Sequence, residues 1–90
     1  MSQWTFITNH GAVLTLVAER GQITAREIGY KLDLAERSVH RIITDLETDG
    51  YLEKHRDGRL NYYRVSKQKP LRRDDMHHVK IGNLLGVLTK

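Results

Sequence analysis

Basic side chains are concentrated in one stretch of this 90-residue chain. Between positions 54 and 73 there are eight lysines and arginines and a single acidic residue, Asp57. Acidic residues outnumber basic ones in the rest of the sequence, although the whole chain has a formal net charge of +4. One segment therefore supplies all the excess positive charge. Such a local excess predicts a polyanion as the binding partner.

A second group of candidate binding residues lies in the helical pattern over positions 35–49. At about 100° per residue the apolar side chains fall on one face, and the opposite face is polar. That polar face carries residue types that contact nucleic acid, namely Arg37, Ser38, His40, Arg41, Thr44 and Thr48. Arginine can form a paired hydrogen bond with guanine in the major groove of DNA, and threonine can contact phosphate or a thymine methyl group. The alternative is an ordinary solvated helix face.

The basic stretch begins in a predicted β-hairpin over residues 51–65. Residues 51–54 and 60–65 are rich in aromatic and apolar side chains, and they flank a turn that contains Asp57 and Gly58. Arg56 and Arg59 would project from this turn into a minor groove, where narrowed DNA attracts arginine. Lys54 and Arg64 would contact phosphates. The alternative is a hairpin whose charges serve solubility alone.

Other chemistry is not indicated by the sequence. The chain has no cysteine, which excludes disulfides, thiolate metal sites and cysteine nucleophiles. The adjacent His77 and His78 would point about 100° apart on a helix, so no metal site is predicted. No glycine-rich phosphate loop or nucleophile elbow is present, so we predict neither an enzyme nor a bound cofactor.

Three helices must position the candidate residues, and we expect them over residues 8–20, 25–32 and 35–49. Thr24 and Glu27 have the spacing of a capping box at the start of the second helix. Only about three residues separate the second and third helices, which predicts a sharp helix-turn-helix unit. Asp33 tolerates the left-handed conformation that this turn needs, whereas Ala35 cannot cap the third helix.

The C-terminal part, residues 70–90, is predicted to contain one helix from Asp74 to about Thr89. Its apolar stripe is predicted to be a dimer interface, formed by Ile81, Leu84, Leu85 and Leu88. Gly82 and Gly86 suggest the close approach of another backbone. A frayed helix end is the alternative.

The chain resembles the winged helix-turn-helix regulators of the MarR and ArsR type. The resemblance covers roughly residues 8–66 and rests on three segments, Thr24 to Leu32, Glu36 to Leu52 and Gly58 to Val65. It implies an α+β fold with a three-helix core, a β-hairpin wing and a C-terminal dimerisation helix. Residues 1–69 would form the DNA-binding domain. The resemblance further implies a homodimer that binds double-stranded DNA and regulates transcription as a repressor.

A winged-helix module that binds protein or RNA is the main alternative, although Arg37, Arg41, Arg56 and Arg59 would then serve little purpose. No stretch approaches the length of a membrane span, and the chain is expected in the cytoplasm. The sequence specifies neither the operator nor a small-molecule effector.

Overall fold

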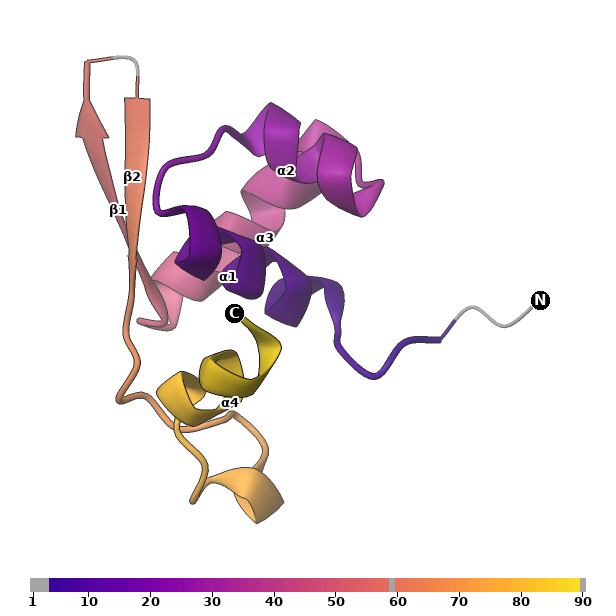
Figure 1. The fold of residues 1–90 in the computed structure, drawn as a ribbon, viewed down its shortest axis with the longest axis vertical. Coiled ribbons are helices and arrows are strands. Elements are labelled where there is room, and N and C mark those ends of the chain that lie inside the picture. Colours follow the sequence, from indigo (N-terminus) through magenta and orange to yellow (C-terminus); the bar gives the residue numbers. More distant parts are fainter. Residues whose placement is uncertain (1–3, 59, 90) are drawn as a thin grey trace.

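Three helices precede an antiparallel hairpin, and a short helix ends the chain (Figure 1). The computed structural model describes residues 4–58 and 60–89. The elements are α1 (Asn9–Arg20), α2 (Ala25–Leu32), α3 (Glu36–Thr48), β1 (Leu52–Asp57), β2 (Leu60–Val65), the 3-10 helix η1 (Asp74–Met76) and α4 (Ile81–Leu88). The predicted α+β winged helix-turn-helix fold is confirmed, and the first three helices begin and end within one residue of the predicted positions.

Threonine side chains cap the first two helices. The Thr8 hydroxyl accepts a hydrogen bond from the Gly11 amide at 3.2 Å. The Thr24 hydroxyl accepts one from the Glu27 amide at 3.0 Å, and the Glu27 carboxylate accepts one from the Thr24 amide at 3.1 Å, which completes the predicted capping box. These hydrogen bonds to Thr24 hold the pKa of Glu27 below its ordinary value.

The turn between α2 and α3 depends on two backbone features. Asp33 adopts the left-handed conformation, with φ of 56°, as its residue type allows. The Leu34 amide then donates to the Gly29 carbonyl at 2.8 Å. A Cβ atom at Gly29 would lie 2.6 Å from the Leu34 carbonyl oxygen, so only glycine fits there. Ala35 precedes α3 as its N-cap residue and provides no side-chain cap, as predicted.

One hydrophobic core joins the helices to the base of the hairpin. Ile28, Val13, Val17 and Val39 are its largest fully buried side chains. Burial of each such side chain stabilises the fold by about 1.5–3 kcal/mol. Among the described residues, the buried hydrophobic ones are Val13, Leu14, Val17, Ile23, Ala25, Ile28, Val39, Ile42, Ile43, Leu46, Tyr51, Leu52, Ile81 and Leu85.

The hairpin is longer than the sequence predicted. Its antiparallel pairing runs from Leu52 opposite Val65 to Asp57 opposite Leu60, so the first strand does not end at Lys54. Gly58 has φ of 64°, the conformation that a tight hairpin turn needs, and the pairing therefore continues almost to the tip. The loop before α2 also joins the hairpin, because the Tyr63 amide donates to the Gly21 carbonyl at 2.8 Å. The sequence did not predict this extra pairing.

The prediction of one continuous helix from Asp74 to Thr89 is wrong. η1 ends at Met76, and α4 begins only at Ile81. The intervening chain pairs instead with the segment after the hairpin: the Leu71 amide donates to Val79 at 2.9 Å, and the Ile81 amide to Lys69 at 2.8 Å. These long-range hydrogen bonds replace helical ones.

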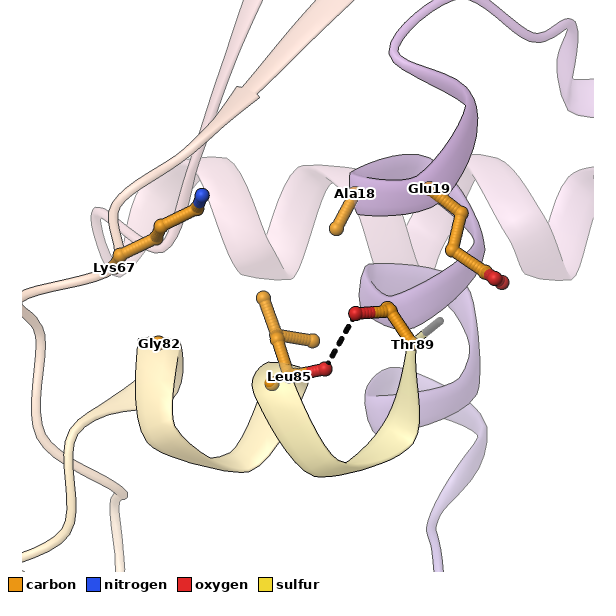
Figure 2. A pocket seen from close by; sticks show the side chains of 7 residues that line it. Ala18, Glu19, Lys67, Gly82, Leu85 and Thr89 are labelled. Atoms are coloured by element: carbon orange, nitrogen blue, oxygen red, sulfur yellow. Dashed lines mark hydrogen bonds between the residues drawn. The ribbon is translucent and has the colours of Figure 1, made fainter.

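α4 packs against α1 within the same chain. Figure 2 shows Leu85 pointing toward α1 beside Ala18, and the Thr89 hydroxyl donates to the Leu85 carbonyl at 2.7 Å. A Cβ atom at Gly82 would lie 3.0 Å from the Lys67 Cβ atom and 3.2 Å from the Lys67 carbonyl oxygen, whereas one at Gly86 would meet nothing within 4 Å. The close backbone approach predicted for these glycines thus occurs only at Gly82, and its neighbour is Lys67.

Candidate nucleic-acid interface

The outer face of α3 presents the predicted binding residues to solvent. Val39, Ile42, Ile43 and Leu46 fix the orientation of the helix because they are buried on its inner face. The side chains of Arg37, His40, Arg41 and Thr44 are consequently exposed, and Ser38 is half-buried. The amphipathic pattern read from the sequence therefore identified the outward-facing side correctly.

The positive charge on this face is not neutralised within the described residues. Neither Arg37 nor Arg41 forms an ion pair with any acid in residues 4–58 and 60–89. The two arginines are four residues apart, a spacing at which like charges repel on a helix. His40 lies 3.6 Å from the exposed Glu36 carboxylate. An external anion would relieve the repulsion between the arginines.

The basic residues of the hairpin are divided between its two faces. Lys54 and Arg56 follow Leu52 by two and four residues along β1, so they lie on the same face of the hairpin as Leu52, which packs on the helices. Arg64 pairs with Glu53 and lies on the other face. The structure therefore does not bring Lys54 and Arg64 together, although the sequence analysis grouped them. The prediction for Arg59 falls outside the described residues.

The wing tip is shaped by a local contact of Arg56. Its Nε atom donates to the Gly58 carbonyl oxygen at 3.0 Å, across the turn. The side chain remains exposed, so its terminal nitrogens can donate to other acceptors. In Figure 1 the wing tip and the beginning of α3 lie toward one end of the molecule, and α4 lies toward the other.

The predicted dimer stripe is split by the packing of α4. Ile81 and Leu85 are 6% and 4% exposed, and they belong to the core of the single chain because α4 turns this side toward α1. These two residues are therefore not free to form the seam predicted for them. Leu84 and Leu88 are only half-buried, and Val87, which the sequence analysis did not single out, is 83% exposed.

The described ranges contain neither a cluster of metal-ligating side chains nor a helix that could span a membrane. No group of three or more His, Cys, Asp or Glu side chains comes together there to hold a metal ion. None of the helices in that part of the chain is both long and apolar enough to cross a membrane.

A tight α2–α3 turn, an exposed basic face on α3 and a basic hairpin define a winged helix-turn-helix DNA-binding protein. The family model described as penicillinase repressor matches residues 9–85, and the chain belongs to that family. It is accordingly a DNA-binding transcriptional repressor and not an enzyme. The predicted fold and DNA binding are confirmed, whereas the assignment to the MarR and ArsR type is corrected to this related family. No curated protein and no solved structure shows a significant match.

Proposed function

We propose that the chain represses transcription as a homodimer on a palindromic operator, with α3 in the major groove. The observation that carries this proposal is the outer face of α3, where Arg37 and Arg41 are exposed and without an acidic partner among the described residues. Arginine at such a position reads guanine through two hydrogen bonds. Ser38, His40 and Thr44 supply shorter donors beside them for bases or phosphates.

The wing is assigned to the DNA backbone and the adjoining minor groove. Arg56 at the tip, together with Arg59, would enter the groove, and Lys54 and Arg64 would contact phosphates on either side of the hairpin. Because Ala35 provides no cap, the first amides of α3 are also available to a phosphate. These contacts position α3, and the base contacts of α3 give the specificity.

The homodimer supplies the second half of the operator contact. One α3 helix reaches only a few base pairs, and two-fold symmetry lets two copies read a palindrome. Two residues of the predicted stripe, Leu84 and Leu88, are only half-buried by the core. We keep these two residues in the proposed dimer interface. A DNA partner and the lack of cysteine favour the cytoplasm as its location.

A salt titration against random duplex DNA tests this function. Affinity should fall linearly with salt on logarithmic axes, at about 0.9 units of slope for each phosphate contacted. Arg56→Ala should reduce that slope by about one unit. The control is Lys80→Ala, which removes the same charge from the exposed start of α4 and should leave the slope unchanged. Failure to bind duplex DNA, or tighter binding to RNA or protein, would favour the alternative interaction module.

A further inference from the structure

Two aromatic side chains near the N-terminus are unusually exposed. Trp4 and Phe6 are 67% and 90% exposed, and their rings stack edge to face with centroids 5.0 Å apart. They are the single tryptophan and the single phenylalanine of the sequence. We call residues 4–7 the strap; in Figure 1 the chain before α1 extends away from the body. An exposed aromatic pair of this kind is typical of a protein–protein interface and not of a surface that stays in contact with water.

A mainly apolar groove, which could hold aromatic side chains, begins beside the strap. It has a volume of about 300 Å³, and it lies between the start of α1, the segment after the hairpin and α4. Leu14, Leu71 and Leu84 contribute to its mainly apolar lining, and Arg72 and Arg73 stand at its rim with exposed side chains. Thr8 and Gly11 also line it, so the groove starts where the strap ends.

The size and chemistry of the groove match the two rings. A cavity of about 150 Å³ holds one benzene ring, so a groove of about 300 Å³ accommodates roughly two rings. The two rim arginines are held by carboxylates, Arg72 by Asp49 at 2.6 Å and Arg73 by Asp75 at 3.0 Å. The flat face of a guanidinium group held in this way can still lie over an aromatic ring, a contact that contributes about 0.5–1 kcal/mol at exposed sites.

The strap of the same chain is badly placed to fill this groove. Ile7 lines a different hollow, together with Leu16 and Leu32, on another side of α1. The strap therefore joins α1 from a side that is not the groove side. Trp4 and Phe6 accordingly do not line the groove of their own chain. The three residues from Ile7 to Trp4 span about 10 Å when extended, which is enough to reach the groove of a second copy docked at the start of α1.

We propose that two copies of the chain exchange straps, so that Trp4 and Phe6 of each fill the groove of the other. The inference rests on the homodimer proposed above and names its interface. Four rings of about 150–250 Å² each, with a similar area of groove wall, bury roughly 1,200–2,000 Å². That is the size of a stable protein interface. Leu84 connects the groove to the exposed part of α4 already assigned to the dimer.

The single tryptophan makes the exchange directly measurable. A dilution series is followed by sedimentation and by Trp4 fluorescence on the same samples. The emission should shift to shorter wavelength in step with dimer formation, because the indole leaves water. If the sedimenting dimer forms while the emission stays that of an exposed indole, or if the wild-type chain is a monomer at all concentrations, strap exchange is wrong.

Variants separate the strap from the rest of the dimer. Trp4→Ala/Phe6→Ala should weaken dimerisation at least 100-fold with unchanged helical content, because both side chains lie outside the core. The control is Tyr30→Ala, which removes an aromatic side chain that is 90% exposed on α2 and should leave the dimer intact. A double variant that dimerises like wild type would overturn the inference.

Mixing two defective variants tests reciprocity. Leu84→Arg places a charge in the groove and should also give monomers. A mixture of this variant with Trp4→Ala/Phe6→Ala should form heterodimers, because one intact strap still meets one intact groove; absence of heterodimers would contradict the exchange. Duplex DNA binding by the monomeric variants is measured in parallel. If the wild-type chain also fails to bind duplex DNA, the proposed function is wrong. If the wild type binds DNA as a dimer while Trp4 stays exposed to solvent, only strap exchange is wrong.

Discussion

Arg37 and Arg41 project from consecutive turns of α3, and their charge is not balanced by any acid in the described chain. We expect Arg37→Ala and Arg41→Ala each to weaken binding to the preferred operator by about 1–3 kcal/mol, and binding to random DNA by less. Competition between the two DNAs measures the difference. Lys80→Ala serves as the control for loss of charge alone. An equal loss on both DNAs would make these arginines phosphate contacts instead.

For single residues, the sequence predicted which side chains of α3 are buried, but it did not predict which face of the hairpin each basic side chain occupies. The helical period separates Val39 and Ile43 from Arg37 and Arg41 without any knowledge of the fold. On the hairpin, the basic residues were grouped by charge alone. Lys54 lies two residues after Leu52, and Arg64 lies one residue before Val65, the partner of Leu52. The strand period of two therefore places Lys54 and Arg64 on opposite faces.

Among the elements, α4 offers a matched pair of glycines for testing how it packs. Gly86→Ala should stabilise the chain by up to about 1 kcal/mol, because alanine favours the helix and nothing lies within 4 Å of the added methyl group. Gly82→Ala should lose this gain or destabilise, because the methyl group would press on the Lys67 backbone. Urea unfolding of both variants measures the difference. Equal stabilisation would show that α4 does not pack closely against Lys67.

The elements that the sequence predicted well are those with local signals. Thr24, Glu27 and Gly21 define helix ends through contacts within a few residues. The interruption between η1 and α4 has no such signal, because it arises from hydrogen bonds between Leu71 and Val79 and between Lys69 and Ile81. The same hydrogen bonds fold the C-terminal segment back onto the body of the chain. Ile81 and Leu85 are buried as a result, so they are separated from Leu84 and Leu88 of the predicted stripe.

For the whole molecule, two-fold symmetry sets the spacing of the operator. Half-sites about 10 base pairs apart face the same side of the duplex, so one dimer can occupy both. Inserting about five base pairs should turn one half-site to the opposite side and reduce the affinity toward that of a single half-site. Gel-shift titration of inverted repeats with graded spacing measures this. Affinity that does not depend on spacing would mean that the two copies bind independently.

The backbone contact at Gly29 also has an evolutionary consequence. The Leu34 amide donates to the Gly29 carbonyl, and the Leu34 carbonyl lies against the bare Cα of Gly29. α2 and α3 are thus held together through main-chain atoms, and the angle between them does not depend on the exposed side chains of α3. Arg37, Arg41 and Thr44 contribute little to the core, and substitutions on an exposed face usually change stability by less than about 0.5 kcal/mol. Operator preference can therefore drift between descendants of this chain while the scaffold stays the same.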